Sequence, residues 1–344
     1  MVDQRNDELR KYINMFGLDS EIIQSILECA VNKRIRSTRI KEIRQIEGNN
    51  YGYQGEKIIP VFTYESEAGE VSEIEMFAKR LNKIELGEEA HYHYLASYGV
   101  PVPRFFGAFR NVSGEEILFI ERLSKIGADF KEPSELKLAL RLLAKINSLP
   151  ISDKYRSYLP PSHKSKTTDL DKALHLVWEY AANGEIGDDL KNFCKTHPVA
   201  LYLSKAETFR RATEDLNFGL IHDDFHKGNI GFNTNGEIVI FDLNSMSCGP
   251  RFWDIARIYG SMPKERYSEL VQGYLFEYLA LNNINLSEAV FFEELDILHN
   301  LKRMTYVKIY LNWSLSGKNG MKLPLEEGKK YQQRILLNTL ASFL

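Results

Sequence analysis

The sequence has few of the features that mark secreted and membrane proteins. Its three cysteines lie far apart among 344 residues and form no Cys-x-x-Cys pair. Neither a disulfide framework nor a cysteine-based zinc site is therefore expected, and a reducing compartment is favoured. The first residues contain no apolar segment typical of a signal peptide, and no apolar run approaches the length of a membrane span. We therefore expect a cytoplasmic protein without a membrane partner.

The sequence also has no large excess of charge of either sign. Its formal net charge is -3, and its isoelectric point is about 6.3. Nucleic-acid binding usually requires a clustered basic face. The local basic run at residues 32–44 is interrupted by apolar residues, so we interpret it as a solvated helix end that leads into a strand. A nucleic-acid partner is not expected, and the sequence gives no indication of oligomeric state.

The length and the change in pattern along the chain predict two lobes. A chain of 344 residues, 44% of them hydrophobic, is too long for one small core. Apolar residues have helical spacing over residues 3–33, strand-like segments follow, and helical patterns dominate from residue 133 onward. We therefore expect an α+β fold. Its N-terminal lobe, residues 1–122, would have an antiparallel sheet, one helix and a helical extension over about residues 1–35. The C-terminal lobe, residues 123–344, would be mainly helical, with a long connection at residues 151–170.

The segment "IHDDFHKGNIGF", Ile221–Phe232, contains the densest group of chemically active side chains. A metal site would need ligands that converge, but consecutive residues in a strand or tight loop point in different directions. No second His/Asp cluster elsewhere supplies the missing ligands. A metal-dependent phosphohydrolase and an acidic turn without chemistry remain as the less favoured alternatives.

Phosphoryl transfer fits this segment and its surroundings better. Such a site needs a carboxylate at the acceptor hydroxyl, a hard oxygen ligand a few residues later, and a second carboxylate from a neighbouring strand. Asp224, Asn229 and Asp242 supply these groups in that order. Asn235-Gly236 between them is a strong hairpin signal. The hairpin is expected to bring Asp242 back beside Asn229.

The same residues resemble the aminoglycoside phosphotransferase/choline kinase superfamily, whose catalytic loop often reads H-G-D-x-H-x-G-N. The matching positions are His222, Asp224, His226, Gly228 and Asn229, followed by Asp242 and by Gly249, Asp254, Ile255 and Ala256. The resemblance implies a bilobal, protein-kinase-like fold that phosphorylates a hydroxyl of a small molecule using Mg²⁺ and ATP or GTP. It implies that Asp224 is the catalytic base, that Asn229 and Asp242 bind magnesium, and that His222 holds the loop in shape.

The N-terminal lobe carries further parts of this resemblance. Lys79 in "EMFAKRL" matches the lysine that grips the nucleotide phosphates, and Glu88 matches its helix partner, with Glu89 as the runner-up. The strand "ILFIERL" leads to the expected hinge, where the backbone of Glu121 and Leu123 would bind the base. The segment "EGNNYGYQGEK" has two interpretations. Either the backbone at Gly48 and Gly52 approaches the nucleotide phosphates, or the segment is a plain hairpin.

The sequence leaves the acceptor open. Asp223 stands where the family usually has glycine, so it is a ligand for a cationic acceptor or a second magnesium, or a solvated acid. The acidic run at residues 287–296 would bind a polyamine or form an ordinary amphipathic helix, and Trp178 would line a pocket or lie in the core. Aminoglycosides, choline-like amines, sugars, amino alcohols and macrolides are all candidates. A protein kinase and a nucleotide-binding regulator without turnover are the alternatives within this fold.

Overall fold

The computed structural model describes residues 10–45, 57–81, 87–111, 113–160, 164–214, 216–317 and 323–344. Gly48 and Gly52 of the expected phosphate loop lie outside these residues. By its internal contacts the chain divides into two compact units. Unit 1 comprises Met1–Leu142, Ser152–Tyr158 and Lys227–Ser245, and unit 2 comprises Leu143–Ile151, Leu159–His226 and Met246–Leu344. The division expected at residues 122/123 stays a prediction.

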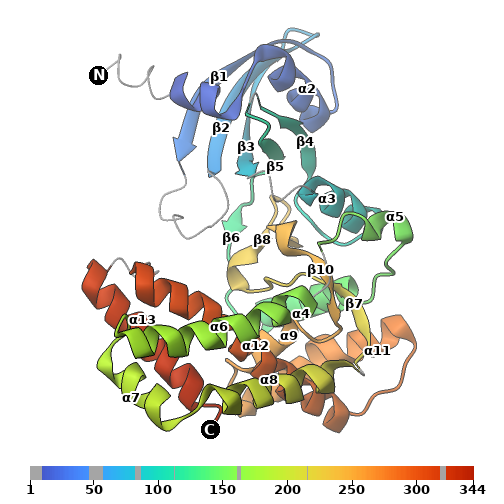
Figure 1. Ribbon diagram of the computed structural model, residues 1–344. Coiled ribbons are helices and arrows are strands. Elements are labelled where there is room, and N and C mark those ends of the chain that lie inside the picture. Colours follow the sequence, from blue (N-terminus) through green and yellow to red (C-terminus); the bar gives the residue numbers. More distant parts are fainter. Residues whose placement is uncertain are drawn as a thin grey trace. The chain divides into compact units, whose positions relative to one another are not determined.

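Unit 1 is built on a five-stranded antiparallel sheet, drawn in blue to green in Figure 1. Its strands are β1 (Ile35–Gln45), β2 (Lys57–Ser66), β3 (Val71–Leu81), β4 (Phe105–Arg110) and β5 (Glu116–Glu121). They follow the order β1-β2-β3-β5-β4. Strands β2 and β3 are joined by a short turn at residues 67–70, as the local sequence "SEAGEVS" predicts.

Helix α2 (Ser20–Val31) covers one face of this sheet. It begins where the side chain of Asp19 accepts a hydrogen bond from the backbone N–H of Ile22, at 2.8 Å. Its buried residues Ile23, Ile26 and Leu27 are spaced for one helical stripe. They pack in a common core with apolar residues of β2, β3, β4 and β5. The helix therefore gives the sheet a rigid backing.

A second, smaller sheet of unit 1 contains the end of the segment Ile221–Phe232. It contains β6 (Lys125–Ile126), β8 (Ile230–Phe232) and β9 (Ile238–Ile240), in the order β6-β8-β9. The turn between β8 and β9 has Gly236 at φ +78°. The side chain of Asn233 accepts backbone N–H groups of Asn235 and Glu237. The predicted hairpin is thus formed, with Ile230 opposite Ile240.

Three helices complete unit 1 or lead out of it. They are α3 (Glu88–Ser97), α5 (Asp153–Arg156) and α4 (Pro133–Asn147), which begins in unit 1 and ends in unit 2. The short 3₁₀ turns η1 (Lys227–Asn229) and η2 (Leu243–Ser245) flank the β8–β9 hairpin.

Unit 2 is mainly helical. Its helices are α6 (Lys164–Asn183), α7 (Asp188–Thr196), α8 (Val199–Glu214), α9 (Ile255–Tyr259), α10 (Tyr267–Leu270), α11 (Phe276–Asn282), α12 (Glu288–Ser316) and α13 (Leu325–Ala341), with the short turns η3 (Lys264–Arg266) and η4 (Val271–Leu275). The long helix α12 contacts α6, α8, α9 and α13. A two-stranded antiparallel ribbon pairs β7 (Phe218–Ile221) with β10 (Ser247–Pro250).

One local expectation was wrong. The connection predicted at residues 151–170 contains α5 and the first turns of α6. Its prolines and polar residues suggested a loop, but α6 already begins at Lys164, and its buried stripe of Leu170, Leu174 and Val177 starts within the predicted connection. Among the described residues, no helix is long and apolar enough to cross a membrane.

Candidate active site

The catalytic-loop segment of unit 2 is held by one buried carboxylate. Asp254, at the start of α9, accepts the backbone N–H of His222 at 2.7 Å and that of Asp223 at 2.8 Å, one on each oxygen. Burial raises the pKa of Asp254, and the opposing charge of Lys302 is the main counteracting influence. Lys302 is itself buried and donates to the carbonyl of Trp253 at 3.2 Å. Asp254 is therefore the anchor of the loop backbone.

Asp223, which occupies the usual glycine position, has a left-handed backbone with φ +65°. Only glycine adopts this region without cost, although aspartate tolerates it better than most residues. The Asp223 carboxylate accepts the indole N–H of Trp253 at 2.7 Å and the hydroxyl of Ser247 at 3.3 Å. These bonds hold the side chain against the β10 ribbon and α9, so it supports the loop.

Asp224 lies between two basic groups. Its carboxylate is 3.0 Å from Nη1 of Arg257 and 3.5 Å from Nε2 of His226, and 47% of its side chain is exposed. Its backbone N–H donates to Nδ1 of His222 at 3.3 Å. Partial burial would raise the pKa of Asp224, but the bond to His226 and the charges of His226 and Arg257 lower it well below its usual value. The carboxylate is therefore ionised at neutral pH, as a base must be.

In unit 1 the structure brings Lys79, Glu88 and Asp242 together. Nζ of Lys79 lies 2.8 Å from Oε2 of Glu88 and 2.6 Å from Oδ1 of Asp242. The side chains of Lys79 and Glu88 are only 5% and 1% exposed. Burial opposes the charge on Lys79, but the two carboxylates raise its pKa above the usual value. Glu89, the alternative partner, instead approaches His93 at 3.6 Å.

Glu88 also fixes the segment that follows Asp242. Its second oxygen, Oε1, accepts the backbone N–H of Leu243 at 3.2 Å. One buried carboxylate thus links β3, α3 and η2. Asp242 itself has a left-handed backbone, with φ +60°, and this bond helps to hold it there.

Lys57 joins the same group and was missed in the sequence. Its Nζ is 3.4 Å from Oδ2 of Asp242, and it is the cross-strand neighbour of Lys79. Two lysines directly opposite one another repel unless an anion lies between them. The sequence did contain a signal for Lys57. This residue is the first of β2, directly after the glycine-containing segment, and it pairs with Lys79 near the end of β3.

Asn229 and Asp242, the expected magnesium ligands, lie at neighbouring ends of the β8–β9 hairpin. The backbone N–H of Phe241 donates to the carbonyl of Asn229 at 3.0 Å. Asn229 is buried, whereas the Asp242 side chain is 17% exposed. Amide and carboxylate oxygens are the hard donors that Mg²⁺ prefers. The oxygen-rich set therefore fits magnesium, and the lysines beside it fit phosphate groups.

An apolar pocket of about 260 Å³ lies beside this group in unit 1. Its lining includes Phe77, Ile120, Phe241, Glu121 and Leu123. The first three also line the small space around Lys79 and Asp242, so the pocket and the charged group adjoin. Mainly apolar walls beside the end of a strand give a pocket of the kind that can hold an aromatic base.

Other sequence candidates have structural partners. The indole N–H of Trp178 donates to the carbonyls of Cys194 and His197, at 3.2 and 2.9 Å, so this residue ties α6 to α7. In the acidic run, Glu294 is bound to the buried Arg251, and Asp296 accepts the hydroxyl of Tyr259 at 2.5 Å. These two acids therefore stabilise the α12 region.

The family assignment follows from comparison with known proteins. Residues 83–288, more than half of the chain, match the model of the phosphotransferase enzyme family (APH). The chain belongs to this family. The prediction of a phosphotransferase is thereby confirmed, and so is the superfamily suggested by the catalytic-loop residues. No curated protein gave a significant match.

Solved structures support the fold. The chain resembles spectinomycin phosphotransferase APH(9)-Ia in complex with ADP and spectinomycin, with 14% identity, 95% of this chain and 98% of that chain covered, and a TM-score of 0.57. It also resembles the GDP complex of aminoglycoside 2'-phosphotransferase-IIIa, with 10% identity, coverage of 95% and 100%, and a TM-score of 0.58. For choline kinase LicA from Streptococcus pneumoniae the identity is 14%, the coverage 94% and 99%, and the TM-score 0.52. The predicted kinase-like α+β fold is confirmed.

Proposed function

We propose that this phosphotransferase transfers the γ-phosphoryl group of ATP or GTP to a hydroxyl of a small molecule, with Mg²⁺ as cofactor. The observation that carries the proposal is the buried Lys79, held between Glu88 and Asp242. A lysine whose pKa is raised, beside a second lysine and an amide–carboxylate pair of oxygen donors, is an arrangement suited to binding a polyphosphate and its metal. Complexes of fold relatives with ADP, AMP and GDP support a nucleotide donor.

The residues of unit 1 would bind the nucleotide. The backbone at Glu121 and Leu123 would bind the base in the apolar pocket, and Lys79 and Lys57 would bind phosphate oxygens. Bound Mg²⁺ would neutralise phosphate charge at the oxygens of Asn229 and Asp242. In this role Asp242 exchanges its present lysine contacts for the metal.

The residues of unit 2 would act on the acceptor. The Asp224 carboxylate would orient the acceptor hydroxyl and take its proton. The hydroxyl oxygen forms a bond to the γ-phosphorus as the bond from that phosphorus to the β–γ bridging oxygen breaks. The nucleoside diphosphate leaves. His222 and Arg257 are positioning residues, because they act on the loop and on the Asp224 carboxylate.

An aminoglycoside-type antibiotic is one acceptor class to test, since two of the structural relatives are named for such substrates. Choline and ethanolamine are a second class, given the kinases of similar fold. The engagement of Glu294 and Asp296 with Arg251 and Tyr259 leaves fewer acids of α12 for a polycation than the sequence suggested.

The test is nucleotide turnover with Mg²⁺ and ATP or GTP against aminoglycosides, macrolides, choline, ethanolamine, sugars and hydroxy amino acids. Asp224→Asn runs beside the wild type. General-base removal is expected to lower kcat by about 10²–10⁴-fold while the affinity for ADP stays unchanged. Acceptor-dependent turnover of the variant within about tenfold of wild type would exclude Asp224 as the base. Nucleotide binding without turnover for any acceptor would favour a regulatory protein.

A further inference from the structure

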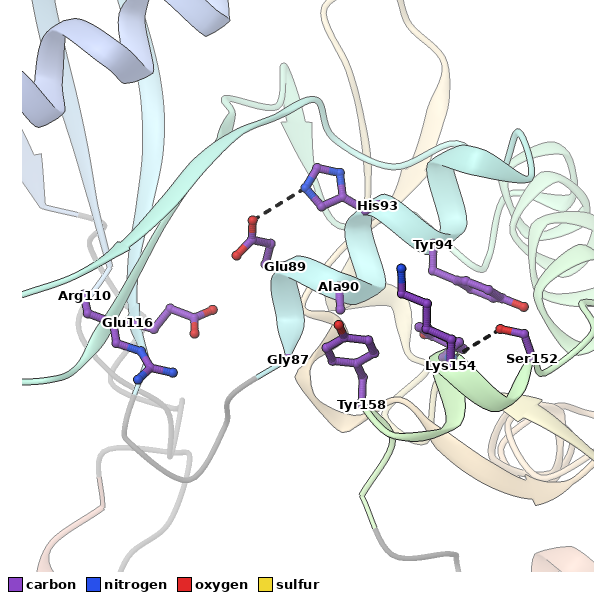
Figure 2. Close-up of a pocket in the computed structure, with 11 residues that line it drawn as sticks. Gly87, Glu89, Ala90, His93, Tyr94, Arg110, Glu116, Ser152, Lys154 and Tyr158 are labelled. Carbon is purple, nitrogen blue, oxygen red and sulfur yellow. Dashed lines mark hydrogen bonds and ion pairs between the residues drawn. The ribbon is translucent and has the colours of Figure 1, made fainter.

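A second pocket of unit 1 is lined by none of the residues proposed to bind nucleotide. It has a volume of about 660 Å³ and is lined by residues of α3, by the ends of β4 and β5, and by α5 with the residues that flank it (Figure 2). No residue proposed above to bind nucleotide, metal or acceptor lines it. Its size is that of a small-molecule site.

One carboxylate oxygen in the lining accepts no hydrogen bond from the described residues. Glu116, at the start of β5, is 8% exposed, and its Oε1 is buried and accepts no hydrogen bond within the described part of the chain. Figure 2 shows its carboxylate turned from the strand toward the pocket, between Arg110 and the first turn of α3. Buried polar atoms are nearly always paired in folded proteins. An unpaired one in a pocket wall indicates a missing donor.

The charges around Glu116 favour a positively charged donor. Burial raises the pKa of Glu116, the nearby charges of Glu89 and Glu88 raise it further, and Arg110 opposes them. Arg110 and Lys154, the cations in the lining, are exposed, so solvent screens their charges. An ammonium group beside Oε1 would supply both the missing hydrogen bond and the missing charge.

Aromatic rings surround the rest of the pocket. The rings of Tyr94 and Tyr155 stack with centroids 3.5 Å apart, and Tyr158 is 46% exposed. Such faces bind both apolar groups and cations. The expected ligand is therefore a small amine with an aromatic or aliphatic body.

The pocket also shares a helix with the nucleotide-binding group. Gly87, Glu89, Ala90, His93 and Tyr94 face the pocket, whereas the intervening Glu88 points to Lys79 and Leu243. The helix begins at Gly87, whose φ of +133° is accessible mainly to glycine. A ligand that shifts this first turn would move the carboxylate of Glu88.

We propose that this pocket is an effector site for a small organic amine, bound by Glu116 and the tyrosine rings, and that its occupation changes nucleotide affinity through α3. The coupling rests on the proposed nucleotide site, but amine binding does not.

The first experiment measures binding without nucleotide. Phenethylamine is titrated into the protein by calorimetry, and 2-phenylethanol, which has the same body without the amine, serves as the matched ligand. Wild type is expected to bind the amine about tenfold more tightly than the alcohol. Glu116→Gln should abolish that preference, and Ala90→Leu should prevent binding of both by filling the pocket. Glu67→Gln, an exposed acid in the β2–β3 turn, should behave as wild type.

The second experiment measures coupling. The affinity for ADP is determined with and without saturating phenethylamine, and a change of about fivefold is expected in wild type but not in Ala90→Leu. Absence of amine binding, or binding unaffected by both pocket variants, overturns the site. Pocket binding with an unchanged ADP affinity overturns the effector role. Phenethylamine binding is measured without nucleotide turnover. A lack of phenethylamine binding therefore does not contradict the phosphotransferase proposal, and a lack of turnover does not contradict amine binding in the pocket.

Discussion

The buried carboxylate of Asp254 accepts the backbone N–H of His222 at 2.7 Å, across 32 residues of sequence. The bond joins the start of α9 to the end of β7. Together with the bond to the N–H of Asp223, it sets the path of the backbone immediately before Asp224. The geometry of the proposed base thus depends on a residue that does not touch the acceptor.

Asp254→Asn tests this dependence. An amide has one acceptor oxygen, so one of the two backbone N–H groups loses its partner, at a cost of about 1–3 kcal/mol in the free energy of unfolding. Urea unfolding would measure the loss. The kcat should fall while ADP affinity is preserved, because unit 1 is unaltered. Asp169→Asn, which changes an exposed acid paired with Lys308, is the control. An unchanged kcat in Asp254→Asn would contradict the anchoring role.

Arg257→Ala is predicted to change the pH dependence of transfer. Partial burial raises the pKa of Asp224, but His226 and Arg257 outweigh it and lower the pKa. Removing Arg257 therefore raises the pKa of Asp224. Since a base must be ionised, the acid limb of the kcat/KM profile should move to higher pH, with the largest loss of activity at the acidic end. Arg303→Ala, which removes a different arginine, on α12, is the control. If the acid limb of Arg257→Ala were identical to that of wild type, the prediction would be wrong.

The backbone and side-chain bonds of Asp223 are expected to contribute to the stability of the protein. Its left-handed backbone is tolerated by aspartate and asparagine but costs other non-glycine residues about 1–2 kcal/mol. Asp223→Ala also removes the acceptor of the Trp253 indole N–H. We expect Asp223→Ala to lower the free energy of unfolding by about 2 kcal/mol. Asp223→Asn, which retains an acceptor oxygen, should stay within about 0.5 kcal/mol of wild type. Equal losses in both variants, measured by urea unfolding, would show that neither feature matters.

Lys79→Met is expected to weaken both folding and nucleotide binding. It leaves Glu88 buried without its ion-pair partner, and removing one member of a buried pair costs about 3–5 kcal/mol. Lys41→Met is the matched control, because both Lys41 and its ion-pair partner Glu73 are exposed, and such pairs contribute about 0–1 kcal/mol. Thermal unfolding and ADP titration measure the two effects. A Lys79→Met protein as stable as Lys41→Met would mean that the buried pair does not support unit 1.

Short-range signals in the sequence were sufficient for much of the fold. Asn235-Gly236 predicted the hairpin, and Gly236 adopts a left-handed backbone within the turn at residues 233–237. The pairing of Lys79 with Glu88 was expected from the resemblance of their two segments to the family, and the structure brings the two side chains together. The roles of these residues in nucleotide binding stay predictions.

Contacts between distant segments could not be predicted in the same way. Arg257 reaches Asp224 across 33 residues, and Glu294 reaches Arg251 across 43. Both depend on how α9 and α12 pack within unit 2, which no local pattern specifies. The helical turns before Leu170 could not be predicted either, because residues 164–169 contain no apolar side chain that would mark them as helical.

The bond from Trp253 to Asp223 has an optical consequence. The indole N–H touches the residue next to Asp224, and Nζ of Lys302 lies 4.7 Å from the ring centre. Indole emission responds to hydrogen bonding and nearby charge, so the loop carries its own fluorophore. Only two other tryptophans, Trp178 and Trp313, contribute to the emission of the chain. With both replaced by phenylalanine, the protein would report the arrival of an acceptor at its base without any added label.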